Sequence, residues 1–581
     1  MRNELQEKRK DTVLCWRDGI FAVSLVAMVC VCLYLARYGF CSFDEAFYLT
    51  IPQRIANGEK LLLNEWHGSQ FSALLLYPVY KLYFALGGTL EGIVLSFRYI
   101  YVVFQTLISV FAFVRLRKRF AWGSVVCSLL LFSYAPFNIR ALSYNSMGIG
   151  LFALCAIILI TVQANRKLDC VLAGFFFGCS VLCCPYLVLV FFPYFLYRCF
   201  GKCLERKGYS VLFSWKDLLF FCVGAGIVAM YLFVFLLIQG VFPDCISMVP
   251  YILDDPEHSG VSVGQKLFDY GYSVFSMNIG SILAACTGCV FILLRITRKT
   301  VDRRVKFIVG CAITLVWLLI SAIQNRHWNY IMLPLTFLSV IAFVNTERKN
   351  WRVFWLAFVP AIGYTICINL SSNLGIMAIS SASCISSAIG LLFIENFVWE
   401  ISYATERKQR NAALLSHIAV CLVIAVQFAS MYALKFIDYP LDMREYKEKQ
   451  IETIDAGVCK GLITTAQNAS VYRKTMQDTE ELRETGEKVL YYTPKCWMYL
   501  GDDKPYASYS AWISINYFDD INERICKRIR TYWEFDPEAK PKYIWIDGSV
   551  RQEPYSVLNW LGVEEYSIEE KQMGFLVSVF G

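Results

Sequence analysis

Two adjacent carboxylates, Asp44 and Glu45, are the residues of this chain whose type and position best suit chemistry. They come a few residues after the first long apolar run, at 18–38, in the segment Phe43-Asp44-Glu45-Ala46-Phe47-Tyr48. Removing a carboxylate from water at an apolar boundary costs free energy, so such a group usually faces a cation, a metal ion or a substrate proton. The pair therefore predicts proton transfer or cation binding.

A helix N-terminus would explain the same two residues without any chemistry. Ser42 would cap the helix, and the two carboxylates in its first turn would complement the helix dipole. The residue types alone leave both interpretations open.

The elements that position this pair are membrane helices. The chain has 581 residues, of which 57% are hydrophobic and only 18% charged, whereas an ordinary globular domain has roughly 25% charged residues. This composition excludes a soluble single-domain enzyme and a disordered chain.

The apolar residues fall into blocks, many of them near the roughly 20 residues that a helix needs to cross a bilayer. We predict an all-α polytopic membrane protein with about thirteen transmembrane helices. The predicted spans are 18–38, 92–114, 122–138, 145–163, 170–184, 186–199, 218–239, 275–295, 307–323, 329–345, 352–370, 375–394 and 412–436.

The distribution of Lys and Arg predicts the orientation. Basic clusters at 8–10, 115–119, 298–304 and 407–410 all fall on the side that carries the N-terminus, and the positive-inside rule makes that side cytoplasmic. The opposite side then carries the loop at 39–91, which includes Asp44 and Glu45, and everything after about residue 437. The Lys and Arg residues of these loops explain the positive net charge of the chain, so no nucleic-acid partner is expected.

Residues 437–581 differ in composition from the membrane domain at 1–436. They hold 18 basic and 25 acidic residues and short strand-like runs in place of apolar blocks. We expect a soluble extracytoplasmic α/β domain that caps the membrane domain or binds substrate. The predicted strands are 461–466, 488–492, 543–547 and 575–580, and the predicted helices are 469–486 and 519–532. Disulfide pairing among Cys41, Cys245, Cys459, Cys496 and Cys526 stays open.

The order of residues in the first third of the chain resembles that of a known superfamily. After the carboxylate pair come Tyr48, Pro52, Arg54, Gly58 and Asn64, then an amphipathic stretch at 71–87, then Arg98 at the start of a span. This order is similar to that of the GT-C glycosyltransferases, in particular the protein O-mannosyltransferases and the bacterial lipid A aminoarabinose transferases. The element at 326–330, Arg-His-Trp-Asn-Tyr, with Leu333-Pro334 after it, also looks like an outer loop of that superfamily.

The resemblance implies a glycosyltransferase that uses a sugar carried on a polyprenyl phosphate. Asp44 would then remove the proton of an acceptor hydroxyl, and Glu45 would orient Asp44 or bind a divalent cation. Attack opposite the phosphate would invert the anomeric carbon. The acceptor, a glycan, a lipid or a protein, stays open.

The donor phosphate would need cations or hydrogen-bond donors. The predicted phosphate-binding residues are Arg98, Arg326, Arg54 and His258, and the predicted substrate-binding residues are Tyr48, Asn145 and His327. Snorkelling to lipid headgroups explains the arginines without function, and a solvated turn around Pro256 explains His258.

A metal site stays open, with Asp44, Glu45 and His258 as its candidate ligands. Two elements of the superfamily pattern are absent. Ser69-Gln70 stands where a Lys-Pro-Pro element is frequent, and Ser143-Tyr144-Asn145-Ser146 lacks an acidic residue.

We therefore expect an integral membrane glycosyltransferase of a bacterial cell membrane, acting in cell-envelope glycan synthesis or protein glycosylation. A flippase or transporter for lipid-linked sugars, and a polymerase or ligase that transfers a whole oligosaccharide, are the alternatives. A flippase has no need of the carboxylate pair beside a lipid-facing entrance.

Overall fold

The structure is a computed structural model that describes most of the chain. It covers residues 2–162, 166–205, 213–254, 262–276, 282–283, 286–288, 290, 301–321, 323, 331–371, 381–402, 407–437, 447–513, 515 and 518–580. Most of the predicted span at 275–295 lies outside the described residues, as do His258, Arg326 and His327.

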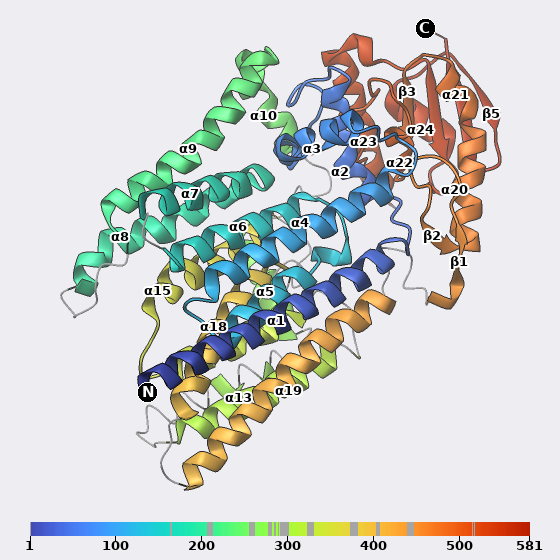
Figure 1. The fold of residues 1–581 in the computed structure, drawn as a ribbon. Helices are drawn as coiled ribbons and strands as arrows, with labels where there is room; N and C mark the ends of the chain where they lie inside the picture. Colours follow the sequence, from blue (N-terminus) through green and yellow to red (C-terminus); the bar gives the residue numbers. More distant parts are fainter. Residues whose placement is uncertain are drawn as a thin grey trace.

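A body of packed helices forms the larger part of the molecule (Figure 1). Six of its helical runs are long and apolar enough to cross a bilayer, by length and composition. They are α1 (Arg2–Ala36), α4 (Ile93–Leu116), α9 (Trp215–Ile238), the run of α15, η7 and α16 (Trp351–Val353, Phe354–Phe358 and Val359–Ser371), α18 (Cys384–Ser402) and α19 (Arg407–Ile437). The chain is thus a mostly helical, integral membrane protein.

The other helices of the body are shorter or carry charged residues. They are α5 (Trp122–Ser133), α6 (Tyr144–Ile160), α7 (Arg166–Cys183), α8 (Phe191–Glu205), α13 (Arg303–Ile320) and α14 (Leu333–Asn345). Two further helices, α10 (Cys245–Leu253) and α11 (Val263–Ser276), lie between α9 and α13 in the chain. The count of thirteen crossings stays a prediction.

Proline residues set two helix boundaries, one of which differs from the predicted one. The run at 122–138 was expected to be helical throughout, but α5 ends at Ser133 and Pro136 opens a turn (η2, Pro136–Asn138) in which Phe137 has φ of 55°. Pro185 separates α7 from α8 through the short helix η3 (Pro185–Val190), because proline cannot continue a helix from the residue before it. The division predicted between 170–184 and 186–199 is confirmed.

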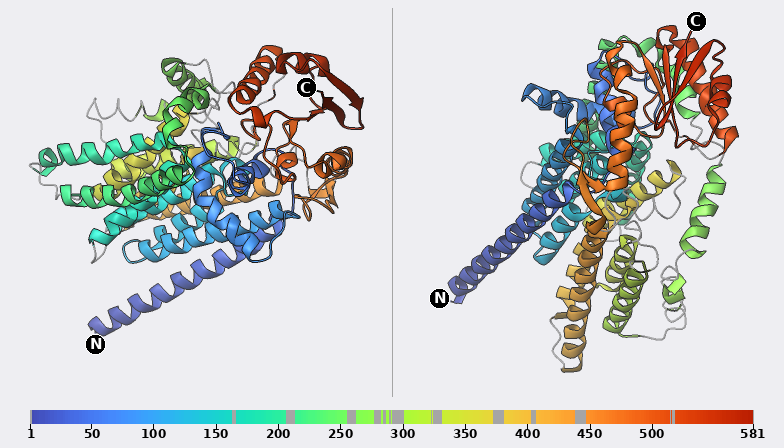
Figure 2. Two further views of the ribbon diagram at one scale, coloured as in Figure 1. Left: turned by 90° about the horizontal axis from the view of Figure 1, so that it is seen from above. Right: turned by 90° about the vertical axis from the view of Figure 1, so that its right-hand side faces the viewer.

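A short helical segment follows α1 and lies outside the bundle. It consists of α2 (Asp44–Ala56), η1 (Gln70–Ser72) and α3 (Ala73–Ala85). Figures 1 and 2 show this segment at the end of the body that carries the C-terminal domain, with the N-terminus at the opposite end. We call this end of the body, where residues 447–580 lie, the capped end.

The C-terminal domain is a small α/β layer. Its sheet has the order β3-β4-β6-β5, in which β3 and β4 are parallel and the other neighbours antiparallel. The strands are β3 (Val489–Tyr492), β4 (Tyr543–Asp547), β5 (Tyr566–Glu570) and β6 (Gly574–Val579), with a separate antiparallel pair, β1 (Gln450–Thr453) and β2 (Ile463–Thr465). The helices are α20 (Ala466–Asp478), α21 (Glu480–Glu484), α22 (Trp497–Leu500), α23 (Asp519–Phe535) and α24 (Pro554–Leu561).

The four strand-like runs of the sequence correspond to β2, β3, β4 and β6. The runs β1 and β5 were not predicted. Strand β5 lies at the edge of the sheet, and none of its residues is buried. Its only strand-favouring residues are Tyr566 and Ile568, so its signal in the sequence is short and weak.

Backbone hydrogen bonds join the domain to the ends of α1 and α4. The Gly39 N–H donates to Ile463 O at 2.9 Å, and the Ile463 N–H donates to Arg37 O at 2.7 Å. At α4, the Gly92 N–H donates to Gly457 O at 3.0 Å. Gly92 has φ of +68°, and a Cβ there would lie 3.2 Å from Lys460 O, so glycine permits this close approach.

The five cysteines considered for pairing, Cys41, Cys245, Cys459, Cys496 and Cys526, are all free thiols. No disulfide among these five holds the domain on the body. Hydrogen bonds and side-chain packing do so instead.

The basic clusters generate a prediction about orientation. Lys118, between α4 and α5, and Lys527, on α23, are both exposed. In intact cells, we expect a membrane-impermeant thiol reagent to label Lys527→Cys but to label Lys118→Cys only after permeabilisation. The unsubstituted chain gives the baseline for its own thiols. The reverse pattern would place the C-terminal domain in the cytoplasm.

A candidate active site at the start of α2

The two adjacent carboxylates take different environments because they begin a helix. Successive residues of an α-helix point about 100° apart, so Asp44 and Glu45 at the start of α2 cannot face the same neighbours. The Glu45 side chain is buried, with 2% of the residue exposed, whereas Asp44 is partly exposed. Only one member of the pair is therefore accessible to a substrate.

Glu45 forms a buried ion pair with Arg98 of α4. The Arg98 Nε donates to Glu45 Oε1 at 2.8 Å, and its Nη2 donates to Glu45 Oε2. Both side chains are 1% exposed. A two-pronged contact of this kind holds the carboxylate in one orientation as well as compensating its charge.

The remaining N–H groups of Arg98 bind backbone carbonyls of the last residue of α1 and of the segment after it. Nη1 donates to Ala36 O at 2.7 Å and to Tyr38 O at 3.1 Å, and Nη2 donates to Gly39 O at 2.9 Å. All five donors of the guanidinium are thus in use. In this arrangement Arg98 joins α1, α2 and α4 and has no donor left for a phosphate.

Asp44 accepts a hydrogen bond from Tyr48, one helical turn further along α2. The Tyr48 Oη lies 3.1 Å from Asp44 Oδ1. Burial raises the pKa of Tyr48, and the charge of Asp44 raises it further, so this phenol keeps its proton and donates. The bond holds the carboxylate in one orientation.

Aromatic rings and one imidazole surround Asp44. The Tyr48 ring is 5.9 Å from the Tyr144 ring, and the Phe47 ring is 4.8 Å from the His67 ring. The Ser69 N–H donates to Nδ1 of His67 at 3.2 Å, which favours the tautomer with its proton on Nε2. Apolar ring faces and a few polar groups around an accessible carboxylate are typical of a ligand site.

Asn145 was predicted to bind substrate, and it lies beside this cluster. Ser143 and Ser146 form a capping box at the start of α6, which places Tyr144 and Asn145 in its first turn. Both side chains are partly exposed. Tyr48 and Asn145 thus lie near Asp44, each next to Tyr144, while a role of either in binding stays a prediction.

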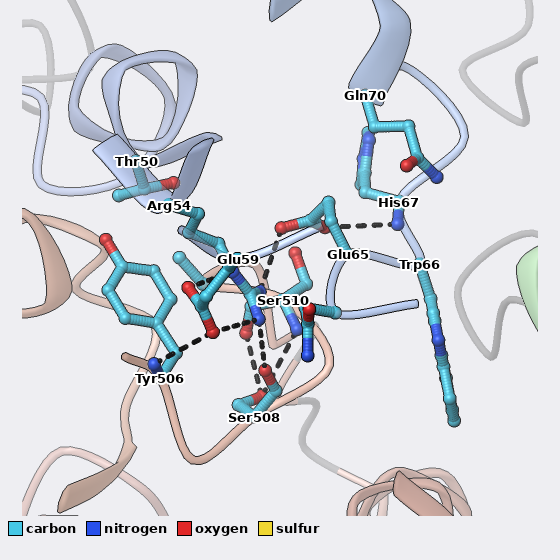
Figure 3. Close-up of polar contacts among 12 residues, drawn as sticks. Thr50, Arg54, Glu59, Glu65, Trp66, His67, Gln70, Tyr506, Ser508 and Ser510 are labelled. Carbon is cyan, nitrogen blue, oxygen red and sulfur yellow. Dashed lines mark hydrogen bonds and ion pairs between the residues drawn. The ribbon is translucent and has the colours of Figure 1, made fainter. Parts of the chain in front are cut away.

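Arg54 lies at the other end of α2 in a second buried cluster (Figure 3). Its Nε is 2.9 Å from Glu59 Oε2, its Nη1 is 3.1 Å from Glu65 Oε2, and its Nη2 donates to Ser508 O at 3.2 Å. The guanidinium also lies over the Tyr506 ring. We call Arg54, Glu59 and Glu65 the Arg54 clamp, because they hold the C-terminal domain at residues 506–510 against α2.

The clamp contains two carboxylates for one guanidinium. Burial raises the pKa of Glu65, and Arg54 only partly offsets this effect. With 2% exposure and a carboxylate on either side, Arg54 is held as a structural cation. Its predicted contact with a donor phosphate would require breaking the clamp.

The described residues do not offer a complete metal site. They contain no group of three His, Cys, Asp or Glu side chains that could hold a metal ion. Glu45, one of the proposed ligands, directs both oxygens at Arg98. Glu45 therefore does not fit as a metal ligand in this arrangement, and His258 lies outside the described residues.

Trp512 is a neighbour of this site that the sequence did not identify. It lies in the C-terminal domain, and its ring is 5.4 Å from that of Phe47. The chain has 14 tryptophans, and no local pattern separates Trp512 from the others. Only the folded contact between two distant segments identifies it.

Comparison with solved structures identifies the fold. The crystal structure of ArnT from Cupriavidus metallidurans in the apo state matches with a TM-score of 0.50 at 12% identity, over 97% of this chain and 98% of that chain. A crystal structure of ArnT from the same organism bound to undecaprenyl phosphate matches with a TM-score of 0.47 at 11% identity, over 96% and 97%. The chain has the ArnT fold along nearly its whole length, so the resemblance to GT-C enzymes is confirmed at the level of fold.

Sequence comparisons do not extend this result. No family model and no curated protein sequence matches the chain.

The buried ion pair generates a prediction about stability. In Arg98→Ala, Glu45 and three carbonyls lose their partner, and breaking a buried pair in this way costs about 3–5 kcal/mol. We expect a clearly lower melting temperature in detergent, and only partial recovery with Arg98→Lys, which lacks the fork. Lys81→Ala, at an exposed position on α3, is the matched control. An unchanged melting temperature in Arg98→Ala would contradict the structural role.

Proposed function

We propose that this protein is an inverting glycosyltransferase that moves a sugar from a polyprenyl-phosphate carrier to an acceptor. The reaction would take place at the capped end, on the outer face of a bacterial cell membrane. Its partners would be the lipid-linked sugar, a glycan, lipid or protein acceptor, and the surrounding lipids. The ArnT fold, which continues into the C-terminal domain, supports the class of reaction.

The observation that carries the proposal is the contrast between Asp44 and Glu45. Helix geometry alone gives the two carboxylates different neighbours, so the evidence for chemistry lies in which partners each one has. Here Glu45 is locked by Arg98, while Asp44 is partly exposed, touches a phenol and lies among ring faces. A general base must be ionised, oriented and reachable, and Asp44 meets the last two conditions in this arrangement.

The reaction follows from the chemistry of the donor. The acceptor hydroxyl attacks the anomeric carbon from the face opposite the phosphate, a new C–O bond forms, and the bond from that carbon to the phosphate oxygen breaks. Asp44 takes the proton of the hydroxyl, and the electron pair of the broken bond leaves with the phosphate. Single displacement inverts the anomeric carbon. A phosphate leaving group needs no protonation by a general acid, so one carboxylate is sufficient.

Each of the two carboxylates has a distinct role in this scheme. Asp44 is the catalytic base. Glu45 and Arg98 are positioning residues, because they fix the start of α2 and so the place of Asp44 relative to α1 and α4. Tyr48 is also a positioning residue, since its hydroxyl binds Asp44 Oδ1. Position errors of about 1 Å can reduce a rate 10²-fold.

The cations that receive the phosphate are a separate part of the proposal. Arg98 and Arg54 are engaged in buried pairs, which favours a structural role for both. We retain Arg326 and His258 as proposed phosphate ligands and His327 as a proposed substrate contact. His67, whose ring lies beside Phe47 and Tyr144, is a further hydrogen-bond donor within the site.

The proposal makes a direct prediction for Asp44. Asp44→Asn keeps the size and shape of the side chain but removes its basicity, so transfer should fall by about 10²-fold or more. The melting temperature should stay within a few degrees, because Asp44 is partly exposed and the buried pair of Glu45 and Arg98 stays intact. The measurement is sugar transfer by the purified protein, with lipid-linked sugars extracted from its host as donors.

Asp520→Asn is the matched control. It also removes a carboxylate from the first turn of a helix, α23, in the C-terminal domain, and should retain full activity. If Asp44→Asn folds normally and transfers sugar at the parent rate, the catalytic role of Asp44 is wrong. A helix-dipole role alone would instead lower stability by about 0.3–1 kcal/mol in both variants.

A further inference from the structure

We propose that Trp512 of the C-terminal domain binds the sugar ring of the donor beside Asp44. The inference rests on the proposed function and assigns the domain a part in it. The site would then be complete only with the domain in place, since Asp44 comes from α2 and the indole from a segment more than 460 residues later in the chain. Trp512 would be a substrate-binding residue and would take no part in proton transfer.

The Arg54 clamp holds the segment that leads to Trp512. Arg54 binds Ser508 O at 3.2 Å, and the Trp66 N–H donates to Tyr509 O at 2.9 Å. The Trp66 and Tyr509 rings are stacked with centroids 5.6 Å apart. Residues 508–509 are thus fixed to the loop after α2 by a charge-assisted hydrogen bond, a backbone hydrogen bond and a ring contact.

Trp512 itself is held by a local turn. Its N–H donates to Ser510 Oγ at 3.1 Å, and the thiol of Cys496 donates to Ala511 O at 3.3 Å. Ser508 Oγ donates to Ser510 O at 2.8 Å. A side chain at the end of such a supported segment has a defined position, which a binding residue needs.

The indole ring lies against the helix that carries Asp44. Its centroid is 5.4 Å from that of Phe47, at an interplanar angle of 62°. Phe47 is three residues after Asp44, on the same side of α2, and its ring contacts Tyr48, the residue that donates to Asp44. Trp512 is partly exposed, so the contact with Phe47 does not bury the whole residue.

The chemistry of the donor fits this surface. One face of a pyranose ring carries mostly C–H groups, and an aromatic face is the protein surface that buries such groups at low conformational cost. The hydroxyl groups of the sugar then remain available to polar neighbours such as His67 and Asn145.

The test compares the lipids that the protein retains. The Asp44→Asn chain is produced in its own host, so that donor is bound but not consumed, and the polyprenyl phosphates that co-purify are measured by mass spectrometry. The readout is the ratio of sugar-bearing to sugar-free polyprenyl phosphate. This ratio can be measured whichever sugar the lipid carries, because the sugar adds its own mass, and it does not depend on turnover.

We expect Trp512→Ala and Trp512→Leu to lower this ratio on the order of tenfold, the scale of one lost aromatic contact. Trp512→Leu keeps apolar packing against Phe47 and so separates binding from folding. Trp512→Phe should retain most of the ratio. Trp560→Ala, at a half-buried indole on α24 of the same domain, is the matched control and should leave the ratio unchanged.

Two results would overturn the inference. An unchanged ratio in Trp512→Leu with a parental melting temperature would assign Trp512 to packing alone. An unchanged ratio, together with a raised KM for acceptor when Trp512→Leu is measured in the chain that keeps Asp44, would assign Trp512 to acceptor binding. If no variant, Trp560→Ala included, retains any polyprenyl phosphate, the proposed function itself fails, and the inference fails with it.

Discussion

The guanidinium of Arg98 donates five hydrogen bonds in a place that water hardly reaches, and the geometry of the capped end depends on them. Two bonds go to Glu45 and three to carbonyls at the end of α1 and just after it. A buried cation with fewer partners would cost several kcal/mol, so α1, α2 and α4 are held in one relative arrangement. Asp44 directly precedes Glu45, so this contact also fixes the position of Asp44. One carboxylate of the pair is thereby held in a buried ion pair, and the other, the proposed base, stays partly exposed.

The C-terminal domain depends on the same region. Its β2 strand pairs with the backbone that Arg98 binds, and the Arg54 clamp fastens a second part of the domain to α2. Helix α2 therefore connects the membrane body to the domain at both of its ends. This arrangement brings Tyr144 and Trp512, from distant parts of the chain, against neighbouring residues of α2, Tyr48 and Phe47.

The sequence could predict the parts of this account that have local signals. Apolar runs located most helices, and four strand-like runs located β2, β3, β4 and β6. The position of Asp44-Glu45 after the first span predicted the candidate site. The sequence could not show that the two carboxylates have different environments, because the partner of Glu45 is 53 residues away. Arg98, at a helix end, also fits a phosphate ligand equally well. The sequence could not show the partners of Arg54 either, since its carboxylates and its carbonyl partner come from separate loops. The pattern of strand β5 was short and weak, and Trp512 had no local pattern.

The most direct test of this account is an experimental structure of the Asp44→Asn protein with its native polyprenyl-phosphate sugar bound. We expect the anomeric carbon beside residue 44, the phosphate on the face of the sugar away from it, and the pair of Glu45 and Arg98 intact. A phosphate bound by Arg98, with Glu45 displaced, would contradict the division of roles between the two carboxylates. A sugar bound far from residue 44 would contradict the proposed reaction itself.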